Sequence, residues 1–170
     1  MDVSTIANLI NALAVTAGVL FAAVQIRDYR RQQHRDSMSG LVRSFQTPSF
    51  AHSLRRLSSL PDNVAREQIP ALLGPNGEDH VYSLLTSWEA LGILLYRKEV
   101  TIDLVDDFFS GPIVVSWRKL SRYIAELRRD AQRETYFEWV QWLAEQMIER
   151  EKQAPPVPAH IAHRRDWKKL

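Results

Sequence analysis

Hydrophobic and polar positions divide the chain into an uncharged N-terminal run and a longer stretch with helical periodicity. The run, residues 3–26, holds 24 residues without a charged side chain. A helix rises about 1.5 Å per residue, so about 20 residues cross a hydrocarbon core of about 30 Å. The run therefore predicts a transmembrane anchor over residues 1–26. A buried helix of a soluble protein is the alternative.

Positive charges follow this run instead of preceding it. A secretory signal carries its positive charge before the apolar segment and a small-residue cleavage site after it. Here Asp2 comes first, and residues 27–37 form a basic juxtamembrane stalk that contains Arg27, Arg30, Arg31 and Arg35. Basic residues flanking a membrane helix favour the cytoplasmic side. The pattern predicts an uncleaved single-pass protein of the inner membrane, with its N-terminus outside and its C-terminal domain in the cytoplasm.

One side of the predicted anchor carries small residues. They recur at steps of four, three, four and four, at Ala7, Asn11, Ala14, Gly18 and Ala22. Small side chains let a second membrane helix approach closely, and an asparagine can hydrogen-bond across the contact. We expect helix–helix packing here, with other membrane-protein subunits or with a second copy. The alternative is that small residues are simply common in membrane helices.

Helical spacing resumes after the stalk and continues through residues 38–152, where no alternating strand pattern of useful length occurs. The sequence thus predicts an all-α protein, in which one N-terminal transmembrane helix is followed by a cytoplasmic bundle of about four or five helices. Residues 153–170 form a basic tail that contains prolines.

Local signals predict where several of these helices begin and end. Thr47 followed by Pro48 is typical of a helix start. Residues 80–100 form the central helix, in which Gly92 indicates close packing against a neighbour because a helical glycine costs about 1 kcal/mol relative to alanine. Residues 101–112 read as a short helix, capped by its first threonine and closed by its final Gly-Pro pair.

Two stretches carry a family resemblance. The apolar run leads into AVQIRDYRRQ (residues 23–32) and is followed later by WEALGILLYRKEVTIDLVDDFFSGPIVVSWRKL (residues 88–120). Together they resemble a family of small bacterial membrane-anchored proteins catalogued only as a domain of unknown function. The resemblance covers about a quarter of the chain. It implies a single-pass helical protein of bacterial origin and supplies no activity or catalytic residue.

The charges divide the chain into an acidic body and two basic ends. Residues 57–149 carry nine basic and fifteen acidic side chains, whereas residues 27–56 carry seven arginines against two aspartates. The basic end of the tail includes Arg164, Arg165, Trp167, Lys168 and Lys169. With the stalk arginines Arg27, Arg30, Arg31 and Arg35, these residues are predicted to contact anionic lipid headgroups at the membrane surface, and not nucleic acid. An acidic partner or a disordered solubilising tail is the alternative for the C-terminal end.

Residues suited to catalysis or metal binding are sparse. The absence of cysteine excludes disulfides and thiolate zinc sites, and no recognised catalytic motif occurs. Glu89 lies in an otherwise apolar helix; a structural ion pair with Arg118 or Arg122 is favoured over a catalytic acid. His160 and His163 lack further ligands at a useful spacing. We therefore expect no enzyme, no cofactor and no metal.

Aromatic residues are concentrated in the last predicted helix. Tyr136, Phe137, Trp139 and Trp142 offer more aromatic surface than one core face needs, so Trp139 and Trp142 are candidate partner contacts. The alternative is that all four fill a small core. The leading hypothesis is a non-enzymatic accessory subunit of a larger membrane protein complex. A homo-oligomeric membrane-anchored sensor or effector comes second, and an enzyme with a site near Glu89 third.

Overall fold

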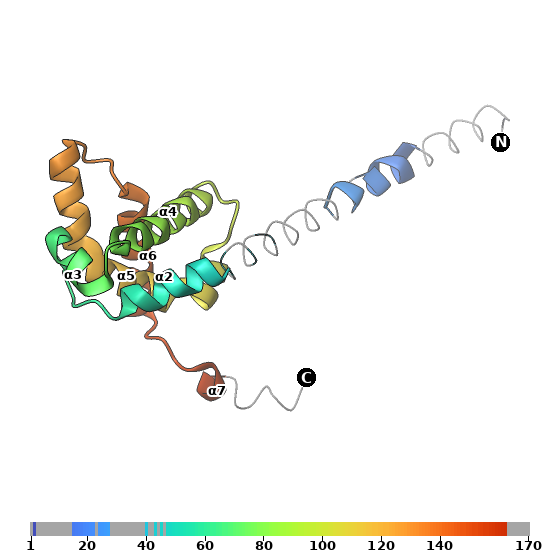
Figure 1. The fold of residues 1–170 in the computed structure, drawn as a ribbon. Helices are drawn as coiled ribbons and strands as arrows, with labels where there is room; N and C mark the ends of the chain where they lie inside the picture. The colour runs from blue at the N-terminus through green and yellow to red at the C-terminus, as the bar shows by residue number, and fades with distance from the viewer. Residues whose placement is uncertain are drawn as a thin grey trace. The chain divides into compact units, whose positions relative to one another are not determined.

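Figure 1 shows a computed structural model of the chain, which divides into two compact units, Met1–Ser44 and Phe45–Leu170. The structure describes Asp2, residues 15–22 and 24–27, the single positions 40, 43 and 45, and residues 47–162. Most of the described residues therefore belong to the second unit.

The first unit corrects the expectation of a membrane anchor. Residues 15–22 and 24–27 are helical, and their large apolar side chains are exposed, from 56% at Val24 to 67% at Val15. Across the residues that the structure describes, no helix combines the length and the apolar character of a membrane span. The predicted transmembrane helix and the single-pass inner-membrane localisation are contradicted by this finding.

The second unit is built from helices joined by short segments. In chain order they are α2 (Pro48–Ser58), the 3-10 helix η1 (Arg66–Gln68), α3 (Ile69–Leu73), α4 (Gly77–Tyr96), α5 (Ile102–Ala131), α6 (Glu138–Gln153) and α7 (Ala159–Ala162). No strand occurs among the described residues, in agreement with the predicted all-α class. The predicted architecture, a membrane span followed by about four or five helices, is wrong: no span is found in the part of the chain that the structure describes, and short helices such as α3 and α7 add to the long ones.

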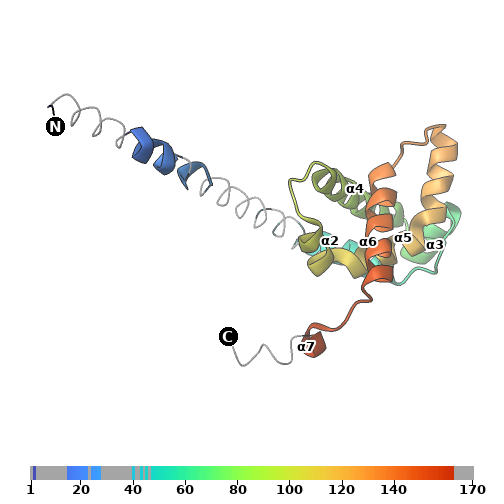
Figure 2. The same ribbon diagram turned by 180° about the vertical axis from the view of Figure 1, so that it is seen from behind.

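Helix α4 is the central element of this unit. It packs against α2, α3 and α6, and α6 packs in turn against α5; Figure 2 shows α6 beside both α4 and α5 from behind. The buried face of α4 is the apolar stripe of the sequence: Val81, Leu84, Leu85, Trp88, Leu91 and Leu95. Residues spaced three and four apart share one helix face, which explains why this stripe could be recognised from the pattern alone.

Trp88 lies at the centre of the core. Its side chain is fully buried, stacked on Phe45 at 5.6 Å and edge-on to Phe50 and Phe109 at 5.3 and 5.8 Å between ring centroids. The indole Nε1 donates a hydrogen bond to the Ser116 hydroxyl at 3.1 Å. A buried N–H without a partner costs about 1–3 kcal/mol. The serine therefore allows the largest side chain of the core to be buried completely.

Both predicted helix starts that depend on threonine are confirmed. The Thr47 hydroxyl accepts from the amide of Phe50 at 3.2 Å, with Pro48 at the first helical position of α2. The Thr101 hydroxyl accepts from the amide of Leu104 at 3.3 Å at the start of α5. Each cap satisfies an amide that lacks a partner within its own helix.

The predicted break at residues 111–112 is wrong, because α5 continues for 30 residues through Pro112. A proline inside a helix removes one backbone hydrogen bond and commonly ends or kinks the helix. Here Phe109 and Ile113 are buried on either side of it, and the Ser116 hydroxyl donates to the Pro112 carbonyl at 2.7 Å. Burial of both halves against the rest of the unit outweighs the local breaker.

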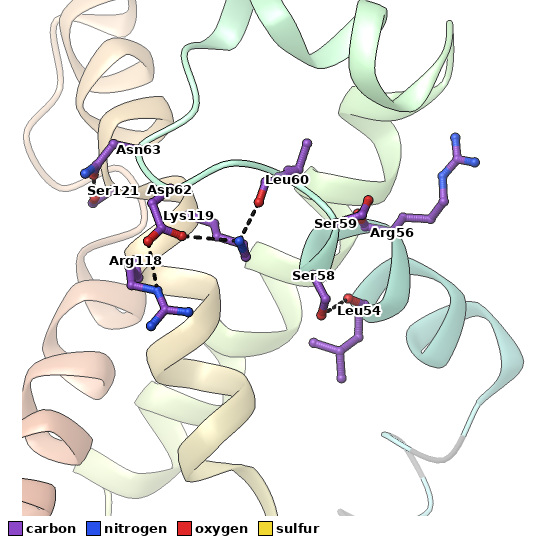
Figure 3. Close-up of polar contacts among 10 residues, drawn as sticks. All are labelled: Leu54, Arg56, Ser58, Ser59, Leu60, Asp62, Asn63, Arg118, Lys119 and Ser121. Carbon is purple, nitrogen blue, oxygen red and sulfur yellow. Dashed lines mark hydrogen bonds and ion pairs between the residues drawn. The ribbon is translucent and has the colours of Figure 1, made fainter.

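The buried Lys119, in the middle of α5, connects this helix by hydrogen bonds to the segment between α2 and η1 (Figure 3). Only 11% of the Lys119 side chain is exposed, and its ammonium donates to the Leu60 carbonyl and to an Asp62 carboxylate oxygen, the latter at 3.2 Å. The amides of Asn63 and Val64 donate to α5 carbonyls at 3.0 and 2.9 Å. A buried charge is tolerated when it is paired and hydrogen-bonded, so these contacts fix the path of the segment.

Replacing this lysine should destabilise the protein. We expect Lys119→Met to lower the free energy of unfolding by about 1.5–3 kcal/mol, because hydrogen bonds to a charged group are lost and the Leu60 carbonyl is left without its donor. Arg118→Met is the matched control: Arg118 pairs with the same Asp62 at 3.2 Å, but 58% of its side chain is exposed, so its loss should cost under about 1 kcal/mol. Equal losses in urea denaturation would contradict the assignment.

Candidate functional site

The contact between α4 and α6 gathers the sequence candidates that the structure places together. Trp139 and Trp142, predicted as partner contacts, lie at the start of α6. Glu89 lies on the side of α4 that faces this start. Residues of this contact form both a buried capping interaction and an exposed aromatic surface, so we take it as the candidate functional site.

The residues predicted to pack or to lie at a membrane surface are elsewhere in the chain. Gly18, Ala22 and Arg27 are helical and exposed in the first unit. The other predicted positions lie outside the described residues: Ala7, Asn11, Ala14, Arg30, Arg31, Arg35, Arg164, Arg165, Trp167, Lys168 and Lys169. Their predicted roles remain predictions.

Glu89 caps α6 from a neighbouring helix. Its Oε2 accepts a hydrogen bond from the amide of Val140 at 2.9 Å, and the backbone of Trp139 provides a second hydrogen bond to the carboxylate. These amides belong to the first turn of α6, where backbone donors have no acceptor within the helix. A negative charge is also favourable at this end of a helix. One carboxylate therefore joins the two helices.

The arginine partner predicted for Glu89 is wrong. Arg118 pairs with Asp62 at 3.2 Å, and Arg122 pairs with Glu126 at 2.8 Å. The hydrogen-bond donors to the Glu89 carboxylate are backbone amides of α6, where the sequence pattern predicted an arginine guanidinium. Both kinds of partner are hydrogen-bond donors, which is why the need for a partner could be predicted although its identity could not.

Burial raises the pKa of Glu89 above its ordinary 4.5, because desolvation disfavours the charged carboxylate. The hydrogen bonds from Val140 and Trp139 oppose this rise, as does the positive charge of Arg128, while Glu138 adds to it. Since desolvation is the largest contribution, the folded chain holds the Glu89 proton more tightly than an exposed glutamate would.

The segment before α6 turns sharply to present these amides to Glu89. No side chain of this segment caps the helix, and Phe137 adopts a left-handed conformation with φ of 53°. That conformation is costly for a bulky residue. Two features hold it in place. Phe137 is buried, with 7% of its surface exposed, and the Arg128 guanidinium donates to the carbonyls of Tyr136 and Phe137 at 2.9 and 3.3 Å.

Gly92 brings the backbones of α4 and α6 together, which confirms the close packing predicted for it. A Cβ atom at this position would lie 2.7 Å from the Trp139 carbonyl oxygen and 3.0 Å from the Trp139 Cβ. Real Cβ atoms do not approach backbone this closely, so a side chain at position 92 would force the helices apart. The absence of a side chain sets how near Trp139 lies to α4.

Three aromatic residues above this contact form an exposed surface, which we call the aromatic patch: Tyr96, Trp139 and Trp142. The Tyr96 ring lies 4.8 and 6.0 Å from the two indoles, which are 5.9 Å from each other. Tyr96 is 62% exposed, and both tryptophans are partly exposed. The alternative, in which Tyr136, Phe137, Trp139 and Trp142 all fill the core, is not met: Phe137 is buried and the other three are partly exposed.

A hollow of 320 Å³ lies beside Glu89. We call it the aromatic hollow; its lining comprises Tyr82, Glu89, Arg133, Thr135, Tyr136, Phe137 and Glu138. Sequence reasoning missed the contributions of Tyr82 and Tyr96. The signal was present, because positions 82, 89 and 96 are seven residues apart and therefore share one face of α4.

Other hollows among the described residues are lined by ion pairs. In one, of 610 Å³, Arg150 pairs with Asp106 of the lining at 3.1 Å and with Asp103 outside the lining at 2.8 Å. In another, of 470 Å³, Arg66 pairs with two carboxylates, each at 3.1 Å. Arginines engage these acidic groups, and no cluster of three or more ligating side chains that could hold a metal occurs in the part of the chain described.

Fold and surface together define an all-helical domain with an exposed aromatic patch. Residues 12–147 match the family described as Domain of unknown function (DUF4760), and the chain belongs to this family. The match includes Glu89 and the whole aromatic patch. No curated protein and no solved structure matches the chain. Membership of a family of unknown function agrees with the resemblance, whereas its bacterial origin remains a prediction.

Substitution at Gly92 tests the close approach of the two helices. We expect Gly92→Ala to lower the free energy of unfolding by about 1–3 kcal/mol, because the new methyl group meets the Trp139 backbone and forces a shift. Gly111→Ala in α5 is the matched control, since nothing lies within 4 Å of its Cβ position. There the gain in helix propensity and the crowding before proline oppose each other, so the change should stay within about 1 kcal/mol. Denaturation of both variants followed by circular dichroism checks this.

The raised pKa of Glu89 gives a pH dependence of defined sign. A proton held more tightly in the folded state stabilises fully below the unfolded pKa, and this contribution is lost as pH rises through the folded pKa. The stability of the wild type relative to Glu89→Gln should therefore fall as pH rises from below the ordinary glutamate pKa through the raised pKa of the folded state. Parallel profiles for the two proteins would contradict this. Glu89→Ala should lower the free energy of unfolding by about 1 kcal/mol, because the first turn of α6 loses its cap.

Proposed function

We propose that the protein is a non-enzymatic accessory subunit whose helical domain binds another protein through the aromatic patch. The observation that carries this proposal is the exposure of Tyr96, which is 62% accessible while its ring contacts both indoles of α6. Contiguous apolar surface of this kind is typical of interaction sites. Tryptophan and tyrosine are enriched among the residues that dominate binding energy at interfaces.

The setting of the patch supports the same proposal. Gly92 and Glu89 fix the start of α6 against α4, so Trp139 is held by its backbone before any partner arrives. Binding costs less when side chains and backbone are already ordered. A rigid aromatic surface of this kind suits a docking role better than it suits a site that must rearrange.

The chemistry at Glu89 favours docking over catalysis. A catalytic acid must transfer its proton to a substrate atom, whereas the Oε2 atom of this carboxylate is engaged by a structural hydrogen bond from the first turn of α6. We therefore retain the accessory role and place the partner on the patch.

Photo-crosslinking tests the proposed role. A benzophenone amino acid in place of Tyr96 should give one discrete adduct with a different protein in the native host, and Trp142→Ala should abolish it. The matched control carries the same probe in place of Phe108, which is 52% exposed on α5 but outside the patch. We expect no adduct from that position.

Two results would overturn the proposal. An adduct between two copies of the chain would favour the homo-oligomeric alternative. The absence of an adduct at Tyr96, or the same adducts from Tyr96 and Phe108, would remove the patch as a specific docking surface. Circular dichroism of the Trp142→Ala protein shows whether a lost adduct reflects lost binding or lost folding.

A further inference from the structure

The aromatic hollow has walls of aromatic rings. The Tyr82 ring on α4 lies 5.2 Å from the Phe137 ring at 73°, and Tyr136 lies 5.1 Å from Phe137 at 88°. Tyr82 is 43% exposed. The hydroxyls of Tyr82 and Tyr136 hydrogen-bond to each other at 2.5 Å. One hydroxyl donates and the other accepts, so this wall offers a ligand its ring surfaces and the O–H of the accepting tyrosine.

The lining of the hollow carries two carboxylates and one basic side chain, and the Arg128 guanidinium acts on Glu89 from outside the lining. Glu89 and Glu138 contribute carboxylates, whereas Arg133 contributes the single basic side chain of the lining. The Arg133 Nε donates to the Thr135 hydroxyl at 3.0 Å, so this arginine is held at the loop. The Glu89 carboxylate is half-buried and accepts the 2.9 Å hydrogen bond from the Val140 amide through its Oε2 atom. Its charge is therefore poorly screened by water.

We propose that the aromatic hollow binds a cationic side-chain head, the ammonium of a lysine or the guanidinium of an arginine, presented by the partner protein. The inference rests on the proposed function and adds the chemistry of the partner. Aromatic rings attract cations through their quadrupole, and the attraction grows when water is excluded. Rings beside two carboxylates provide both forms of attraction in one place.

The hollow and the aromatic patch adjoin each other in the structure. Phe137 and Glu138 of the hollow precede Trp139 of the patch directly in the chain, and Tyr82, Glu89 and Tyr96 share one face of α4. A partner segment lying on the patch could therefore place a basic residue in the hollow. In such an arrangement the patch supplies apolar area, and the hollow selects for positive charge.

Tetramethylammonium is a suitable probe, and tert-butanol is a neutral molecule of similar size. The full chain, with its tyrosine rings carbon-13 labelled, is titrated with each and followed by NMR. Tetramethylammonium should shift the Tyr82 and Tyr136 ring signals saturably, and tert-butanol should leave them unchanged. Equal responses to both probes, or no saturable response to tetramethylammonium, would overturn the inference without recourse to any variant.

Matched variants locate the binding. Tyr82→Leu should weaken the affinity for tetramethylammonium about two- to fivefold, the loss expected for one exposed cation–ring contact. Arg133→Gln should strengthen it, because a competing positive charge is removed from the lining. Unchanged affinity in both folded variants would overturn the assignment to this hollow.

The two proposals fail separately. A crosslinked partner at Tyr96 without tetramethylammonium binding would remove only the cationic specificity. Tetramethylammonium binding without any crosslinked partner would remove the docking role, and the partner part of this inference with it.

Discussion

The candidate surface depends on one carboxylate that completes the first turn of a helix to which it does not belong. Glu89 of α4 accepts hydrogen bonds from backbone amides of α6, which has no capping side chain of its own. These amides would otherwise be unsatisfied where α6 meets α4. The carboxylate is half-buried, so the contact combines a desolvated charge with the donors it requires. Trp139 is positioned by this contact because its backbone is part of the capped turn.

Several independent constraints converge on the same turn. Gly92 permits the backbone of α4 to approach Trp139, and Arg128 holds the carbonyls that precede α6. Phe137 adopts its left-handed conformation between them. A strained residue persists only where its surroundings over-determine it, and here the surroundings are the two helices whose junction carries the exposed aromatics. The same features that stabilise the core contact therefore fix the geometry of the surface above it.

Local signals explain what could be predicted from the sequence. Thr47 and Thr101 cap amides three residues further on, and the stripe of α4 repeats within a few residues, so each is visible in a short window. Glu89 reaches a partner 51 residues away, and no local pattern specifies which donor will arrive there. At Pro112 a local signal gave the wrong prediction. The proline indicated the end of a helix, but the burial of the residues on both sides of it keeps α5 continuous. The uncharged run was interpreted as an anchor from its length and from the arginines that follow it, and no described helix has the length and apolar character of a membrane span.

The continuity of α5 makes the domain sensitive to length as well as to composition. Near its start Asp103 pairs with Arg150, in its middle Lys119 holds Leu60, and near its end Asp130 pairs with Arg66. Each residue of a helix turns the chain by about 100°. One residue inserted between positions 112 and 119 would rotate the second half of α5 out of alignment with the first. The spacing of these three contacts fixes the number of residues in α5. Relatives of this chain should therefore vary in length between the helices and not within this one.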